Sequence, residues 1–175
     1  ALFKVDWYAT EPFYTEEKPR AGWVLVSKEP LSDSTNKDYL QQTDRIVKEL
    51  QTLYPPTDTR HIAITYHKAI EDFHKERSKI EQLLKDNKWK EAADILELLF
   101  ITKQTRHSAP EAYYDAMLLR ASTKSDSLLS NIYTWTFSRS SSGLLVGVGV
   151  AVVSGAYVGG WHAGSRVGDL GVLFV

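Results

Sequence analysis

The chain has no cysteine, and several other residue types are missing from part of its 175 residues. Without cysteine it has no disulfide bond, no thiol nucleophile and no thiolate metal site. A formal net charge of −1 and a pI near 6.6 provide no basic field for a nucleic-acid backbone, so we expect no nucleic-acid partner. A basic and then apolar N-terminal stretch is also lacking, so the sequence predicts no signal peptide.

Glycine is nearly absent from the first part of the chain and common in the last. Of the ten glycines, only Gly22 precedes residue 137, and nine lie in residues 137–175. The overall composition, with 43% hydrophobic, 11% aromatic and 25% charged residues, is that of a globular protein. The length fits one domain, so we treat residues 1–175 as a single folded unit.

The middle of the chain has the pattern of an all-helical segment. Apolar residues recur at helical spacing after a capping box at Thr35 and Asp38, until Pro55 and Pro56 stop the helix. Two further amphipathic helices are predicted on either side of a tight turn at residues 86–87. A second capping box, Ser108 with Glu111, begins a last helix that ends near residue 122.

Short strand patterns lie at both ends of the chain and enclose these helices. The sequence therefore predicts an α+β fold with small antiparallel sheets built from both ends. The predicted strands are residues 2–8, 22–27, 131–137, 144–153, 156–161 and 170–175.

The apolar segment 144–160 allows a different interpretation, a membrane-interacting protein. No formally charged residue lies between Arg139 and Arg166, and glycine pairs four residues apart match a helix-dimer spacing. Against a membrane span, the most apolar stretch is half of the ~20 residues that a helix needs to cross a bilayer. Alternating valine and glycine also suits a strand better than a helix.

Chemical motifs are few. His67, Glu71 and His74 follow helical spacing and would place three zinc ligands along one helix face, which keeps a metal-dependent enzyme as another alternative. They lie in a segment crowded with lysine and glutamate, which favours a solvated flank and no metal. No nucleophile elbow, Walker loop or dinucleotide fingerprint is present, so we expect a protein that is not an enzyme and holds no cofactor.

The glycine-rich tail also omits particular residue types. Lysine, glutamate, glutamine, methionine and tryptophan fill 34 of the first 136 positions, but Trp161 is their sole representative in residues 137–175. Strand and turn preferences explain part of this bias. These five are also the amino acids that cannot arise from an asparagine codon, AAY, when its two adenines are replaced by any base. Their near-absence therefore indicates diversification by adenine substitution.

Four segments carry a resemblance to a known family. The stretches 22–26 (GWVLV), 34–43 (STNKDYLQQT), 133–136 (YTWT) and 170–172 (LGV) resemble the variable proteins of diversity-generating retroelements, above all the archaeal type. The wider group includes phage receptor-binding tropism determinants. The resemblance implies a C-type lectin-like fold, binding in place of catalysis, and a hypervariable C-terminal surface at residues 137–175 that recognises a protein or other surface ligand. It further implies a location on a cell or virion surface.

Residues 65–119 exceed what a minimal lectin fold needs and are interpreted as a helical insertion. No calcium-type sugar-binding triplet is present, and without cysteine the catalytic thiols of the formylglycine-generating relatives cannot exist. The tail is then expected to combine a buried frame with outward-facing variable positions. The frame residues are Tyr133, Trp135, Leu145, Val146, Val148, Val158, Trp161, Leu170 and Val172. The outward, ligand-binding positions are Phe137, Ser142, Leu144, Gly147, Val150, Val152, Tyr157, Gly159, His162, Gly164, Arg166 and Gly168.

Overall fold

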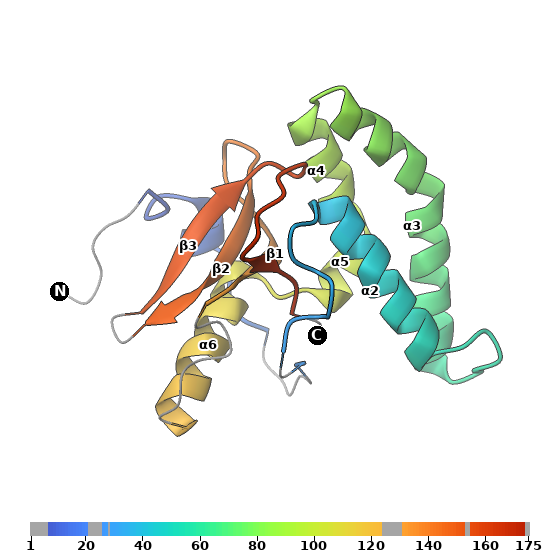
Figure 1. Ribbon diagram of the computed structural model, residues 1–175, viewed down its shortest axis with the longest axis horizontal. Coiled ribbons are helices and arrows are strands. Elements are labelled where there is room, and N and C mark those ends of the chain that lie inside the picture. Colours follow the sequence, from blue (N-terminus) through green and yellow to red (C-terminus); the bar gives the residue numbers. More distant parts are fainter. Residues whose placement is uncertain (1–6, 21–25, 28, 124–130, 153–154, 174–175) are drawn as a thin grey trace.

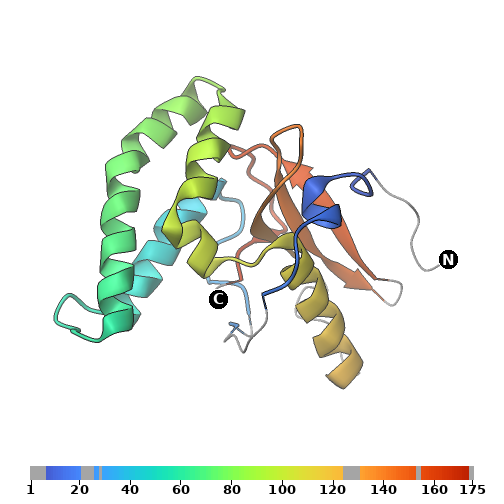
Figure 2. The ribbon, with the colours of Figure 1, turned by 180° about the vertical axis from the view of Figure 1, so that it is seen from behind.

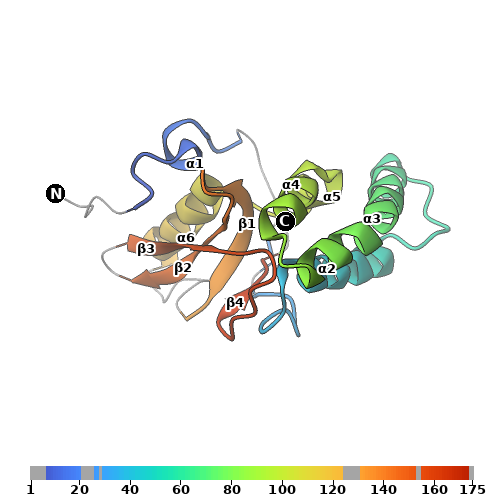
Figure 3. The ribbon, with the colours of Figure 1, turned by 90° about the horizontal axis from the view of Figure 1, so that it is seen from above.

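A curled four-stranded sheet lies between two groups of helices, as the computed structural model shows (Figures 1 and 3). The structure describes residues 7–20, 26–27, 29–123, 131–152 and 155–173. Helices α2 to α5 pack on one side of the sheet, and α1 and α6 lie on the other (Figure 3). This arrangement confirms the predicted α+β class.

Helix α2 (Tyr39–Leu53) covers the predicted helix but begins about one turn later than the predicted capping box implies. Asp38 is the N-cap, its carboxylate accepting a hydrogen bond from the Gln41 backbone N–H at 2.9 Å, while the Gln41 side chain accepts one from the Asp38 N–H. The proposed Thr35–Asp38 box is therefore wrong by one turn. Because Asp38 has extended backbone angles, it belongs before the first turn and not in it.

Helices α3 (His61–Lys85), α4 (Trp89–Leu98) and α5 (Phe100–Thr105) follow, and α3 runs antiparallel to α2 (Figure 1). The tight turn predicted after α3 is confirmed: Asn87 adopts a left-handed conformation with φ 58°, and the Lys88 N–H bonds to the Leu83 carbonyl at 2.9 Å. This turn brings the start of α4 to the same end of the molecule as the sheet's connecting turns (Figure 1).

Helix α6 (Ala109–Thr123) starts at the predicted Ser108–Glu111 box. The Glu111 carboxylate accepts from the Ser108 N–H at 2.8 Å, and the Ser108 hydroxyl accepts from the Glu111 N–H at 3.3 Å. Arg20 adds an ion pair to Glu111 at 2.7 Å. This contact holds the segment after α1 (Pro12–Thr15) against α6 (Figure 2).

The sheet has the order β3-β2-β1-β4, with β1 (Tyr133–Arg139), β2 (Leu145–Val152), β3 (Gly155–Trp161) and β4 (Leu170–Gly171). Strand β2 pairs antiparallel with both β1 and β3, and β4 pairs parallel with β1. The prediction of wholly antiparallel sheets is therefore wrong for β4, because the long β3–β4 connection carries the chain back across the sheet to run beside β1 in the same direction.

All strands of the described residues come from the second half of the chain. Of the N-terminal strand predicted at 2–8, residues 7–8 form a turn, and the rest lies outside the described residues. Of the strand predicted at 22–27, residues 26–27 are not in a strand, and positions 22–25 are likewise outside. A sheet contribution from the N-terminal end therefore stays a prediction.

The sheet separates two apolar cores because both of its faces are covered. Trp135, Leu145 and Leu170 pack with α2 to α5 in the larger core. Val146 and Val148 pack with α1 and α6 in the smaller one. Segment 144–160 therefore forms strands and not a helix, and no helix of the described chain is long and apolar enough to span a membrane.

Candidate functional site

The connection from β3 to β4, residues 162–169, alternates between anchored and outward positions. Ala163 is 1% exposed, and its carbonyl accepts a hydrogen bond from the Tyr39 N–H at 3.0 Å. Val167 packs against the larger core, and its carbonyl accepts from the Asn36 N–H at 3.0 Å. His162, directly before Ala163, and Arg166, directly before Val167, are both exposed. The backbone is thus fixed while the neighbouring side chains are free to differ.

A second turn, between β1 and β2, meets this connection at the same end of the sheet. Gly143 closes it in a left-handed conformation with φ +87°, and its N–H bonds to the Ser140 carbonyl at 2.9 Å. Arg139 joins the turn to α4, because its guanidinium pairs with Asp94 and with Glu97, the latter at 3.1 Å. Ser142 at the tip is exposed. The turn is therefore held rigidly against α4.

Trp89, the first residue of α4, lies between two adjoining hollows at this end. One, of about 250 Å³, is lined by Lys88, Lys90, Ser142 and His162 among others, and the other, also about 250 Å³, by Arg166 and Gly164. The Trp89 and His162 rings are 6.1 Å apart at an interplanar angle of 35°. We call these two hollows with Trp89 the turn site.

The absence of a side chain at Gly164 makes room for the Trp89 ring. A Cβ atom on Gly164 would lie 2.2 Å from Trp89 Cζ3, far inside van der Waals contact. The aromatic ring can therefore rest directly on the backbone of the β3–β4 connection. This contact joins α4 and the connection into one surface.

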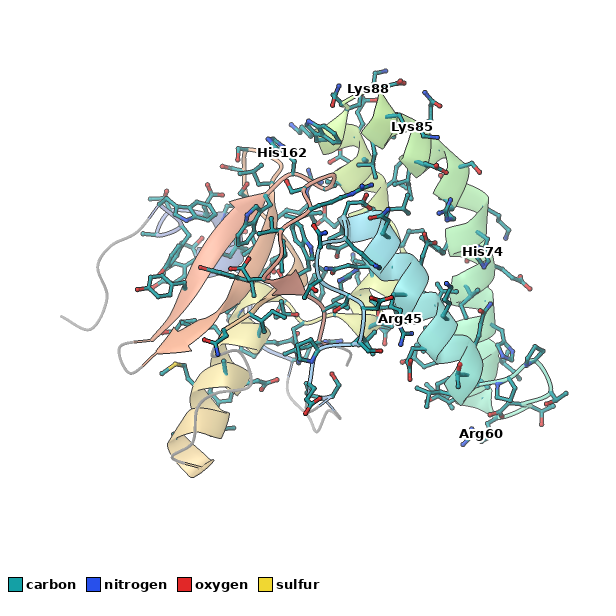
Figure 4. All side chains as sticks on the ribbon, in the orientation of Figure 1. Arg45, Arg60, His74, Lys85, Lys88 and His162 are labelled. Carbon is teal, nitrogen blue, oxygen red and sulfur yellow. The ribbon has the colours of Figure 1, made fainter. Side chains whose placement is uncertain are left out.

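Basic side chains outnumber carboxylates in the lining of the turn site: Arg77, Lys85, Lys88, Lys90 and Arg166 against Asp38, Glu81 and Glu91. Figure 4 shows His162, Lys85 and Lys88 at the same end of the molecule. Neither Lys88 nor Lys90 forms an ion pair with a carboxylate of the described chain, so both ammonium groups remain open to a ligand.

The second hollow is internally paired. Arg166 binds Asp38 at 3.0 Å, and Lys85 binds Glu81 at 3.0 Å. The hydrogen bond from Lys85, followed by its charge and by the hydrogen bond from Arg77, lowers the pKa of Glu81. An incoming ligand would therefore compete with existing ion pairs here.

The twelve predicted outward positions fall into four groups. Four meet at the turn site or beside it with room for a side chain, namely Ser142, His162, Arg166 and Gly168. Gly164 lies there too, but the Trp89 ring occupies the place of its side chain. Three others have at least partial exposure elsewhere on the sheet: Phe137, Leu144 and Tyr157, the last 55% exposed. The side chains of Val150 and Val152 lie outside the described residues.

For Gly147 and Gly159, the prediction of an outward position is wrong. Gly147 is buried, and a Cβ there would lie 2.7 Å from the Trp161 ring and 3.3 Å from Leu170. At Gly159 a Cβ would lie 2.3 Å from the same ring. Trp161 covers both glycines, so neither can present a side chain without displacing it.

The predicted frame is largely confirmed. Six of its nine residues are buried, namely Trp135, Leu145, Val146, Val148, Leu170 and Val172. Tyr133, Val158 and Trp161 are partly buried and pack against the two cores. Trp135 contacts Tyr39 and Trp161 edge to face, with ring centroids 5.3 and 5.8 Å apart.

The helix positions weighed as zinc ligands do not form a cluster in the structure. His67 Nε2 lies 2.9 Å from the Tyr54 carbonyl oxygen, whereas Glu71 and His74 are exposed. Among the described residues, no group of three or more histidine and carboxylate side chains is placed to hold a metal ion.

The helical side of the turn site was not anticipated from the sequence. The sequence predicts only an amphipathic helix after residues 86–87, and it singles out neither Trp89 nor Lys88 and Lys90 as binding residues. The available signal was a tryptophan two residues after Asn87, at the first position of the next helix. Comparison with models of known families, with curated proteins and with solved structures finds no match.

Proposed function

We propose that this protein binds a ligand, a protein or another surface group, through the turn site, and that adenine-directed mutagenesis diversifies this surface. In this proposal the chain is a variable protein of a diversity-generating retroelement with a C-type lectin-like fold, displayed on a cell or virion surface. The observation that carries it is the alternation in residues 162–168, where core-anchored Ala163 and Val167 are interleaved with His162, Arg166 and Gly168. A fixed backbone with replaceable outward side chains is what such a protein requires.

The roles of the individual groups follow from their surroundings. Trp89 offers an aromatic face of the kind that dominates binding energy in interfaces. Lys88, Lys90 and His162 surround it with hydrogen-bond donors, and the two lysines attract acidic groups. The expected partner surface therefore has one apolar residue for Trp89 and carboxylates around it.

The tolerance of outward positions is tested with two libraries of equal size. One randomises Ser142, His162, Arg166 and Gly168 together; the control randomises Trp135, Leu145, Ala163 and Leu170, all nearly inaccessible. Most members of the first library should remain folded, as judged by protease resistance on display, and most of the second should not, because core substitutions cost about 2–5 kcal/mol each. Equal loss of folding in both libraries would contradict the proposal.

The origin of the diversity is tested in the DNA. We expect a nearby second copy of the sequence that encodes residues 137–175, differing at adenines, beside a reverse transcriptase gene. If the flanking DNA held neither, the mutagenesis part of the proposal would fall, while the binding part would still depend on the library result.

A further inference from the structure

A separate cavity of about 290 Å³ lies on the opposite side of the sheet, between α1, α6 and β3. Figure 2 shows these elements next to one another, with α1 in front of the sheet. The cavity shares no lining residue with the turn site. Five aromatic rings and one carboxylate dominate its wall, namely Tyr8, Phe13, Tyr14, Tyr113, Tyr114 and Glu17.

The aromatic rings approach one another at angles and do not stack flat. Tyr8 and Tyr14 meet edge to face with centroids 5.3 Å apart, and Tyr8 and Phe13 are 6.4 Å apart. Phe13 is buried at 3% exposure, whereas Tyr14 is 52% exposed. The wall thus has a fixed inner ring and outer rings that a bound molecule could cover. Aromatic faces carry negative quadrupole charge, and several of them around one space favour a cation.

Glu17 is the single charged side chain of this wall, and it is held in place. Its carboxylate accepts a hydrogen bond from the Ser138 hydroxyl, which itself accepts one from the Ala109 N–H at 2.8 Å. Ser138 is 1% exposed, so this support is rigid.

No basic side chain of the described chain forms an ion pair with Glu17. Burial, chiefly, raises its pKa; the hydrogen bond from Ser138 lowers it, and the nearby carboxylates Glu97 and Glu111 raise it further. Glu97 and Glu111 are themselves paired with Arg139 and Arg20, so Glu17 is the carboxylate of this group that a bound cation could pair with.

We propose that this cavity binds a small alkylammonium compound, its cationic head against the aromatic rings and beside the Glu17 carboxylate. An anion would be repelled by Glu17. A neutral apolar molecule would remove water from that carboxylate and offer no compensating charge. An alkylated ammonium group has an apolar surface for the rings and a positive charge for Glu17, so it satisfies both parts of the wall.

Choline tests the inference because a neutral molecule of nearly the same shape exists, 3,3-dimethylbutan-1-ol. Both are titrated into the full chain and followed by isothermal calorimetry and by shifts of the tyrosine ring NMR signals. We expect choline to bind at least about tenfold more tightly than the neutral alcohol, since this difference isolates the positive charge. Equal affinity of the two, or no choline binding at millimolar concentration, would overturn the proposal.

Two variants and a control locate the site. Glu17→Gln keeps the shape and can still accept the Ser138 hydrogen bond, and it should weaken choline binding about tenfold while leaving the neutral alcohol unaffected. Tyr14→Leu should weaken it several-fold by removing one ring. Glu16→Gln is the matched control, because Glu16 is exposed and absent from the wall. If Glu16→Gln reduced choline binding as much as Glu17→Gln, a general charge effect would replace the proposed site.

Discussion

Replacing single glycines of the C-terminal region by alanine gives a graded test of which positions belong to the fixed frame. At Gly149 the added Cβ would lie 2.2 Å from the Ile132 carbonyl oxygen and 2.4 Å from Tyr133 Cα, both backbone atoms of the neighbouring chain segment. At Gly164 it would meet the Trp89 side chain at 2.2 Å, and at Gly168 nothing lies within 4 Å. The three sites therefore differ in what has to move.

The expected costs follow from that difference. Carbon atoms rest about 3.5–4.0 Å apart, so Gly149→Ala requires backbone movement of more than an ångström between β1 and β2. We expect it to lower the free energy of unfolding by about 3 kcal/mol, at the upper end of over-packing costs. Gly164→Ala should cost about 1 kcal/mol, because the Trp89 side chain can turn outward. Gly168→Ala should change stability by less than about 0.5 kcal/mol.

Urea unfolding followed by circular dichroism measures all three variants, with constant m-values as the sign that the unfolded states are comparable. The Gly164 variant is also compared in a Trp89→Phe background. There its cost should shrink and its change in tryptophan fluorescence should vanish, because the displaced ring is gone. If Gly149→Ala unfolded within about 1 kcal/mol of the parent protein, the register between Tyr133 and Gly149 and the frame built on it would be refuted.

Four further substitutions have defined outcomes. Burial raises the pKa of Glu111, but hydrogen bonds from Arg20 and the Ser108 backbone lower it to about 2 overall. Its contribution, about 2 kcal/mol after allowance for the solvent-exposed Arg20, is present above pH 5 and lost as the pH falls toward 2. Glu111→Gln should therefore show a smaller drop in urea stability from pH 7 to pH 3 than the parent. Arg106→Ala should cost about 3–5 kcal/mol in the same assay, since it removes a fully buried side chain stacked 4.0 Å over a tyrosine ring. Asp38→Ala should cost about 1 kcal/mol as a lost helix cap, whereas Arg166→Ala, which removes only its exposed ion-pair partner, should cost less than about 0.5 kcal/mol; equal costs would contradict the separate roles of frame and surface.

Local signals explain which elements could be predicted from the sequence. The Ser108–Glu111 box and the turn at Asn87 depend on residues within five positions of each other, and both are observed. The helix before Pro55 was also predictable from its apolar spacing, although its first residue was not. The outward turn residues were likewise predictable, because glycine- and serine-rich connections between strands face solvent.

Contacts between distant segments explain what could not be predicted. The outward position of Gly147 was inferred from the residue types that the tail omits and from the family resemblance. The sequence could not correct it, because residues 145–149 form one apolar run, and such a run does not tell one face of a strand from the other when both are covered. The Trp161 ring covers Gly147 and so makes it a buried position, and this ring reaches Gly147 only because β2 pairs with β3. Trp89 is a similar case, since its place beside His162 depends on α4 packing against a turn more than 70 residues later in the chain.

The turn site and the aromatic cavity beside Glu17 rest on different cores, so the side chains of one can change without disturbing the other. The anchors of the turn site, Ala163 and Val167, pack in the larger core, whereas Phe13 and Val158 of the aromatic cavity pack in the smaller one. Alternate residues of β2 point into opposite cores, so the sheet itself is the barrier between them. A new side chain at His162 or Arg166 therefore reaches neither the rings around the cavity nor Glu17. Diversification of the turn site would leave the cavity and its cation preference unchanged.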